Sequence, residues 1–312
     1  MKRCFPLLFG PLVLLPASLL GAEWKAERTN DAVVVRDVQG AEVVRYQLQP
    51  LQGSKLAVDS ACYFHPARTP SGLALTEVAP PDHLHHRGIF LAWVEMHGKK
   101  DADFWGWGEH APKTNRVIVN LSVKLGDHGK DRAGFEARND WIAEGDVMIH
   151  EKLEATARQQ HPANILDLTY TLTPVSDVTL SRWAFSGFCM RTRKDGKLEA
   201  FGPDGPVTLK NPKHTEPASD WPAASWYAYT LKLDDGKKAG MAVFNDPRNP
   251  KTLWHNHRDI RMLNPCIVAP DEVPLKANEP LVLRYRVALF DGELRPEFIG
   301  KLAADFGGAE TH

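Results

Sequence analysis

The chain contains 312 residues, in which 38 Lys and Arg balance 39 Asp and Glu, and 43% of the residues are hydrophobic. This composition is typical of a globular protein and excludes the disordered, collagen-like and coiled-coil classes. Without a basic excess, nucleic acid is not an expected partner. The 23 Pro and 23 Gly argue against a helical bundle. Nine Trp and 13 His are unusually many, and these side chains serve aromatic stacking and acid-base or metal chemistry.

The N-terminus has the parts of a signal peptide. Lys2 and Arg3 precede an apolar run over residues 4–20, and the small residue Ala22 comes just before a polar stretch. The run contains three prolines and is shorter than the roughly 20 apolar residues of a membrane-spanning helix. We therefore expect residues 1–22 to be a cleaved signal peptide, and residues 23–312 to be exported to the periplasm or the extracellular space.

Three cysteines, Cys62, Cys189 and Cys266, follow the expected cleavage point. Because three is an odd number, at least one thiol stays free or pairs between chains. Their spacing is too wide for a zinc knuckle, and a chain of this length does not need disulfides to hold a core. We expect them to be mostly buried and unpaired.

The rest of the chain alternates with a period of two residues and is interrupted often by turn residues, a pattern that predicts β-strands. The expected strands are residues 32–36, 42–48, 116–124, 133–141, 147–158, 164–173, 207–210, 226–233, 240–244, 261–263 and 281–290. Only residues 295–305 have a helical pattern. The prediction is an all-β fold, a large antiparallel β-sandwich with a short C-terminal helix, in which residues 23–312 form a single domain.

Side-chain parity within the long strands predicts which face is buried. In residues 281–290 the odd positions are apolar, whereas Arg284 and Arg286 occupy the other face. The polar faces are either exposed to solvent or line a concave groove. Glu151 breaks its own pattern, because it shares a face with apolar residues. It needs a partner such as an Arg, or its pKa rises and it becomes a candidate acid or base, unless a β-bulge changes the register.

Residues 80–110 concentrate polar side chains beside aromatic ones. Asp82, His83, His85, His86 and Arg87 fall within six residues. Preceding prolines should keep this segment extended, with His83 and His85 on one side and His86 on the other. An H-x-H pair on a strand can present two imidazoles to a metal. It can equally supply acid-base groups to a sugar hydroxyl, with Asp82 fixing a tautomer, or it can be a polar loop whose histidines cap backbone groups.

An aromatic turn follows at residues 104–108, where Trp105 and Trp107 alternate with glycines. Indole faces beside small residues suit stacking on a pyranose ring, although packing against the edge of the sandwich is the more common use. Arg191 lies in a polar segment that we expect to be an ordered loop at a strand end. A second H-x-H, formed by His255 and His257, is weak evidence on its own.

The segment from Asp82 to Gly88, with Pro80 before it and Phe104 and Trp105 after it, resembles the PmoA-like family, also named methane oxygenase PmoA. The likeness continues through residues 187–191, 226, 245–250, 254, 264–265, 284–286 and 291–292. The resemblance implies an exported bacterial protein of unassigned function with a galactose-mutarotase-like β-supersandwich. It transfers no catalytic residue. Methane oxidation does not follow, because the chain has no second apolar run.

Three functions are compatible with these residues. The first is an enzyme of carbohydrate metabolism that acts on a sugar or glycoside in a concave β-sheet cleft without a cofactor. In it, the histidines and Asp82 are catalytic, and the substrate-binding residues are Arg87, Trp105, Trp107, Arg191, Arg284 and Arg286. The second is a metal-dependent enzyme with His83 and His85 as ligands of a divalent metal, completed by an acidic residue such as Glu95, Asp103 or Glu109. The third is a non-catalytic glycan-binding module.

Overall fold

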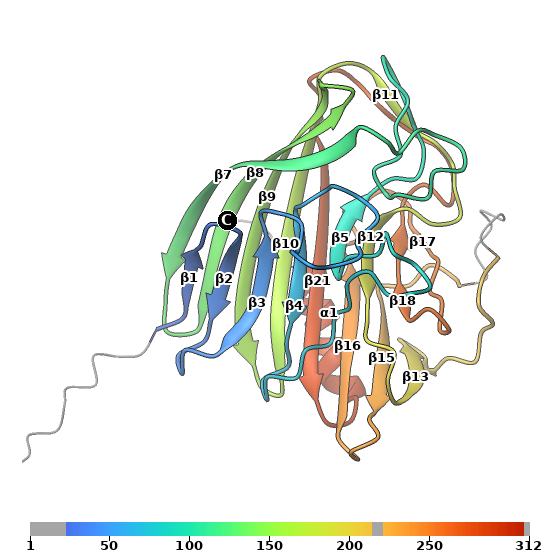
Figure 1. Cartoon of the computed structure of the whole chain (residues 1–312). Helices are drawn as coiled ribbons and strands as arrows, with labels where there is room; N and C mark the ends of the chain where they lie inside the picture. The colour runs from blue at the N-terminus through green and yellow to red at the C-terminus, as the bar shows by residue number, and fades with distance from the viewer. Residues whose placement is uncertain (1–22, 214–220, 309–312) are drawn as a thin grey trace, which may run out of the picture.

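The computed structural model describes residues 23–213 and 221–308. The expected signal peptide, residues 1–22, lies outside the described residues. Most of the described chain is antiparallel β-structure. The helix of the described residues, α1 (Pro296–Gly307), lies at the C-terminal end, so the predicted all-β sandwich with a short C-terminal helix is confirmed (Figure 1). No helix among the described residues is long and apolar enough to cross a membrane.

A nine-stranded sheet has the strand order β14-β13-β15-β16-β21-β10-β9-β8-β7. Its strands are β7 (Arg116–His128), β8 (Arg132–Ala143), β9 (Asp146–Gln160), β10 (Ala163–Pro174), β13 (Lys197–Gly202), β14 (Gly205–Pro206), β15 (Trp226–Lys232), β16 (Lys238–Asn245) and β21 (Leu281–Asp291). The β7–β10 meander and the β21 strand lie where alternation predicted them. Residues 207–210 do not form the expected strand. The N–H of Val207 donates to Ala200 O, but the residues that follow form no further ladder pairs with a neighbouring strand.

A seven-stranded sheet has the order β1-β2-β3-β4-β5-β12-β18. It contains β1 (Lys25–Arg28), β2 (Ala32–Arg36), β3 (Glu42–Gln47), β4 (Tyr63–Ala67), β5 (Ile89–Ala92), β12 (Gly187–Arg191) and β18 (Met262–Leu263). Two smaller sheets complete the fold: β20 (Val273–Leu275), β11 (Val178–Leu180) and β6 (Met96–His97), and the pair β17 (Leu253–Trp254) and β19 (Pro265–Cys266).

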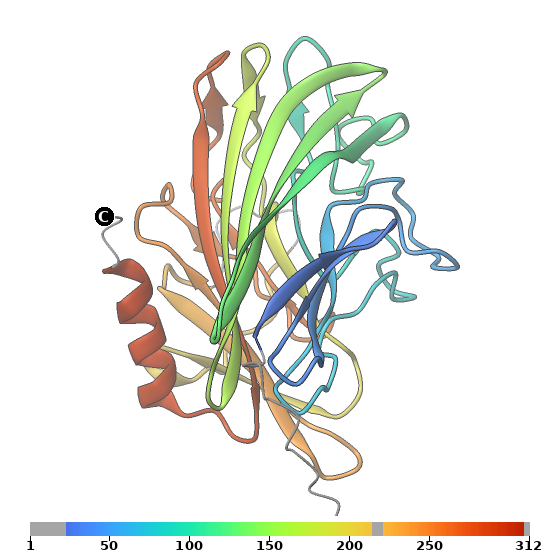
Figure 2. The same cartoon turned by 90° about the vertical axis from the view of Figure 1, so that its left-hand side faces the viewer.

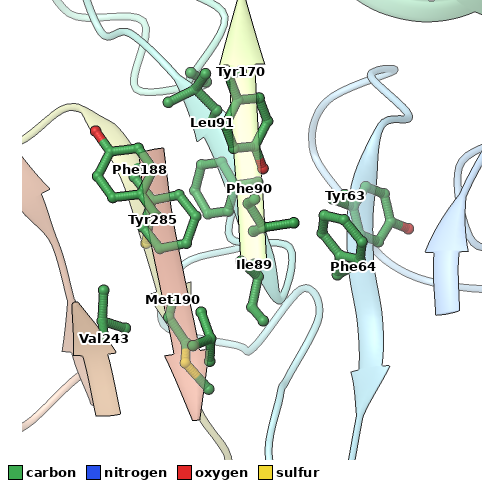
Figure 3. Close-up of a cluster of buried hydrophobic side chains, with 14 of the residues drawn as sticks. Tyr63, Phe64, Ile89, Phe90, Leu91, Tyr170, Phe188, Met190, Val243 and Tyr285 are labelled. Atoms are coloured by element: carbon green, nitrogen blue, oxygen red, sulfur yellow. The ribbon is translucent and has the colours of Figure 1, made fainter. Parts of the chain in front are cut away.

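The main core lies between the two large sheets, and α1 covers the opposite face of the nine-stranded sheet (Figure 2). Aromatic and aliphatic side chains from β4, β5 and β12 meet those from β10, β16 and β21 (Figure 3). The Phe188 and Tyr285 rings, one from each sheet, stack with centroids 4.2 Å apart. Cys62, Cys189 and Cys266 form no disulfide, and Cys189 and Cys266 are buried, as expected.

Candidate functional site

The segment before β5 folds into two consecutive turns. The backbone N–H of His83 donates to Pro80 O (2.9 Å), and that of His86 donates to His83 O (3.0 Å). The extended conformation expected from the prolines is therefore wrong. Pro81 occupies the second position of the first turn, where its fixed φ favours turning. The turns bring together three imidazoles that an extended strand would have separated.

We call His83, His85 and His86 the His cluster. The rings of His83 and His86 stack with centroids 4.7 Å apart, and His85 contacts both edge-on, at 5.6 Å from His83 and 4.7 Å from His86. His86 is buried, whereas His83 and His85 are partly exposed. The cluster therefore leaves the rings of His83 and His85 partly exposed and anchors them on the third, although His83 Nδ1 and His85 Nε2 are themselves buried.

Arg191, the last residue of β12, connects the His cluster to a carboxylate. Its Nη2 donates to both oxygens of Asp82, at 2.8 and 3.0 Å, and its Nη1 lies 3.4 Å from His86 Nδ1. Lys194 Nζ lies 2.9 Å from Asp82 Oδ2, and His83 Nδ1 lies 3.3 Å from the same oxygen. β12 pairs with β5, so the end of one strand and the start of the other meet here. Arg191 thus meets Asp82 and the histidines in the structure, but its side chain is 0% exposed and already paired, so it supports the cluster and the expected role in substrate binding is wrong.

Burial and cationic neighbours keep the His cluster neutral at pH 7. Desolvation, followed by the charges of His83, Arg87 and other cations, lowers the pKa of His85 to about 3. Desolvation also lowers the pKa of His83 and of His86. Partial burial would raise the pKa of Asp82, but hydrogen bonds and charges from Lys194 and Arg191 outweigh it and lower that pKa. The site therefore combines a stable carboxylate with imidazoles that are neutral at pH 7. Of these, His83 is best placed to accept a proton, because Asp82 raises its pKa against the effect of burial, whereas the pKa of His85 falls to about 3.

Arg87 and Trp105 are structural, and their expected roles in substrate binding are wrong. Arg87 is buried, and its guanidinium donates to three carbonyls, those of His85, Phe104 and Trp105, at 3.0 to 3.3 Å. Trp105 is 0% exposed, and its ring packs against those of His86 and Phe90. A side chain enclosed on all sides cannot stack on a sugar. The pair instead joins the aromatic turn to the His cluster.

Trp107 is the aromatic residue of the turn that is partly exposed. Its ring stands edge-on to His85, with centroids 6.0 Å apart. Asp103 holds the turn, since its carboxylate accepts hydrogen bonds from the N–H groups of Gly106 and Gly108. Desolvation outweighs these bonds and raises the pKa of Asp103 to about 6. Trp107 thus keeps a position in which it can contact a molecule bound at His85.

Arg284 and Arg286 do not join the His cluster, and their predicted role as substrate binders is wrong. Both alternate with Leu283, Tyr285 and Val287, which face the main core, so they lie on the α1 side of β21. Arg286 is buried there: it donates to both Asp167 oxygens and to Leu302 O, and its guanidinium lies over the Phe306 ring at 4.6 Å. Its contacts fasten α1 to the sheet.

Glu151 keeps the inward orientation that parity predicts. Its carboxylate accepts hydrogen bonds from Asn139 Nδ2 (2.7 Å) and Trp141 Nε1 (2.8 Å). The β-bulge between β8 and β9 lies at Trp141 and Ile142 and does not turn Glu151 outward. Desolvation, partly offset by the two donors, raises the pKa of Glu151 to about 7. The residue is buried between the sheets, away from solvent.

Across residues 23–213 and 221–308, no group of three or more His, Cys, Asp or Glu side chains is arranged to hold a metal ion. The acidic residues expected to complete a shell around His83 and His85 have other contacts. Glu95 lies 2.7 Å from His97, Asp103 holds the aromatic turn, and Glu109 accepts a hydrogen bond from Trp107. The metal hypothesis therefore gains no support from these residues.

Sequence reasoning missed Lys194 and Glu77. Glu77 lies beside Arg191, with Oε2 3.7 Å from Nε, and its backbone N–H donates to Arg191 O. Lys194 comes three residues after Arg191, at which β12 ends. Its place beside Arg191 could therefore have been predicted from the sequence. No signal in the sequence placed Glu77 there. The second H-x-H lies close by, because His257 pairs with Met262, which pairs with Arg191.

A hollow of about 500 Å³ lies elsewhere, between α1 and the loop after β16. Its wall is largely apolar, with Phe244, Pro247 and Phe306 among the lining residues. The buried Asp246 in this wall accepts hydrogen bonds from Arg248, at 2.6 and 2.8 Å. Because this carboxylate is already occupied, the hollow offers less acid-base chemistry than the His cluster.

Comparison with solved structures gives distant similarities. A galactose mutarotase related enzyme from Lactobacillus acidophilus matches at 6% identity over 86% of this chain and 97% of its own, with a TM-score of 0.38. An α-galactosidase from Geobacillus stearothermophilus matches at 9% identity over 87% of this chain and 40% of its own, with a TM-score of 0.40. A heparan sulfate lyase from Pedobacter heparinus matches at 8% identity over 91% and 38%, with a TM-score of 0.37. Similarities this distant leave the function to be argued from the site.

Comparison with curated proteins gives no match. The family model that matches residues 33–304 is that of a family of unknown function, DUF6807. The PmoA-like assignment made from the histidine-rich segment is therefore wrong. The matched region includes the nine-stranded sheet, the seven-stranded sheet without β1, the His cluster and most of α1, and the chain belongs to the DUF6807 family of unknown function.

Proposed function

We propose that the protein is an enzyme that acts on a sugar or glycoside by acid-base chemistry at the His cluster. One observation carries the proposal: two partly exposed, neutral imidazoles, His83 and His85, stand between an ionised Asp82 and the indole of Trp107. A base must be unprotonated at the working pH, and a sugar ring presents C–H groups to an aromatic ring and O–H groups to an imidazole.

His83 and His85 have different roles in this proposal. Asp82 contacts His83 Nδ1, which leaves Nε2 of the same ring to accept a proton from the substrate. His85 is more deeply buried than His83, and its Nε2 has no hydrogen-bond partner among the described residues. A substrate hydroxyl that reached this buried nitrogen would give it a hydrogen-bond partner, while His86, held by Arg191, supports both rings.

Turnover assays on sugars, glycosides and 3-keto-glycosides test the proposal, with His83→Asn and His85→Asn as variants. The matched control is His97→Asn, because His97 is an exposed histidine paired with Glu95 and Asp101. We expect a loss of about 10²-fold or more in kcat for His83→Asn, and wild-type activity for the control. Absence of turnover on every compound, or activity that survives both variants, would overturn the proposal. A sugar that binds but stays unchanged for hours identifies a glycan-binding module instead.

We also propose that residues 1–22 are removed on export. The proposal rests on the charged start and the apolar run of the sequence. N-terminal sequencing of the protein from cell fractions tests it. A mature N-terminus at Glu23 in the periplasm or the medium supports export, and an intact Met1 in the cytoplasm contradicts it.

A further inference from the structure

An exposed lysine lies against the aromatic turn beside His85. Lys113 Nζ donates to Gly106 O at 3.3 Å, and its side chain runs along Gly108, where a Cβ would lie 2.7 Å from Lys113 Cδ. Gly106 also touches the His cluster, since a Cβ there would lie 2.8 Å from His85 Cβ. Both glycines have positive φ, 102° and 77°, a backbone conformation that L side chains rarely adopt. The ammonium of Lys113 and the imidazole of His85 are thereby placed at the same glycine.

Lys113 differs from the other cations around the His cluster in having no counterion. Arg87 is buried and occupied by carbonyl oxygens, whereas Arg191 and Lys194 both bind Asp82. Within the described ranges, Lys113 forms no ion pair and contacts a neutral carbonyl. Its positive charge is one of those that lower the pKa of His85. A solvent-facing positive charge beside His85 therefore lacks a negative partner within ion-pair distance.

We infer that the substrate is an acidic sugar, such as a uronic acid or its glycoside, whose carboxylate binds Lys113 while its ring lies against His85 and Trp107. This inference rests on the proposed function and adds the substrate class to it. A charge-assisted hydrogen bond between ammonium and carboxylate is stronger than one between neutral groups. A uronic acid carries its carboxylate and its ring O–H and C–H groups on one residue, which suits an ammonium and an imidazole that flank one glycine.

Calorimetric titration with glucuronate and galacturonate, compared with glucose and galactose, tests the inference. We expect the acidic sugars to bind at least tenfold more tightly at low salt, with the preference falling as ionic strength rises. Lys113→Gln should remove most of this preference and leave the affinity for neutral sugars unchanged. Lys124→Gln, at an exposed lysine on β7, is the control and should keep the preference.

The outcomes separate this inference from the proposed function. Equal affinity for acidic and neutral sugars, or a preference that survives Lys113→Gln, overturns the inference. If the enzyme turns over neutral sugars in a His83-dependent way and ignores uronates, the proposed function stands and the substrate class is wrong. If glucuronate binds in a Lys113-dependent way but no compound is turned over, the acidic-sugar site stands and the proposed catalysis is wrong.

Discussion

Arg191 and Asp82, which lie 109 residues apart in the chain, form an ion pair in which one guanidinium nitrogen donates to both carboxylate oxygens. Arg191 is 0% exposed, whereas the Asp82 side chain is 24% exposed. A buried charge that loses its partner costs more free energy than the pair contributes, because the remaining ion stays desolvated. Asp82 is therefore needed both to hold Arg191 in place and to keep the His cluster oriented.

Asp82→Asn should destabilise the protein and alter His83. We expect the free energy of unfolding to fall by about 2 to 3 kcal/mol, since a hydrogen bond to a charged group is lost and Arg191 stays buried. The pKa of His83 should fall further, because Asp82 raises it in the wild type. Urea denaturation and an NMR titration of the imidazole measure the two effects. Asp101→Asn, at an exposed partner of His97, is the control and should cost less than about 1 kcal/mol. Equal costs for the two variants would contradict the prediction.

The half-buried His65 should make the protein less stable in acid. Desolvation, with a contribution from Arg68, lowers the pKa of His65 to about 4 from 6.5. The folded state then binds fewer protons than the unfolded state between these values, so stability is full above pH 6.5 and falls as the pH drops toward 4. We expect His65→Gln to remove roughly 1 to 3 kcal/mol of the difference in unfolding free energy between pH 7.5 and pH 4.5. The same pH dependence in variant and wild type would refute this role.

Glu151 should act in the opposite direction. Its folded pKa of about 7 lies above the usual 4.5, so the folded state binds more protons between these values. Stability from this group is therefore present below pH 4.5 and is lost as the pH rises to 7. For a fully buried carboxylate, the free energy of unfolding should decline by about 3 kcal/mol across this pH range, and Glu151→Gln should remove that decline. Urea denaturation from pH 4.5 to 8.5 measures it. A variant that loses as much stability as the wild type at high pH would show that the carboxylate is compensated.

The long strands could be predicted because a period of two residues is repeated over ten or more positions. In β21, alternation correctly assigned Leu283, Tyr285 and Val287 to the core between the sheets. The same pattern could not reveal that α1 covers the other face, so Arg286 was assigned to a binding site when it fastens the helix. Strands of two residues, such as β17 and β18, are too short to show any alternation.

The residues of the candidate site could be predicted better than their geometry. The density of histidines before β5 identified the segment, but proline was interpreted as a source of extension, whereas Pro81 occupies the second position of a turn. The contact between Asp82 and Arg191 depends on the pairing of β5 with β12, which no local pattern contains. Trp105 is buried whereas Trp107 is partly exposed. The residues around the two tryptophans are too similar for the sequence to predict this difference.

Trp105→Ala and Trp107→Ala should therefore have different effects, although the two residues are neighbours in one turn. Trp105 is fully buried among His86, Phe90 and Phe185, so its removal should cost about 3 to 5 kcal/mol of unfolding free energy. Trp107 is partly exposed beside His85, so its removal should cost much less stability but weaken sugar binding by about two- to tenfold, in line with the 0.5 to 1.5 kcal/mol of an aromatic contact. Thermal unfolding and calorimetric titration distinguish them. A folded Trp107→Ala variant with wild-type affinity for every sugar that binds would remove Trp107 from the site and leave the imidazoles as its polar centre.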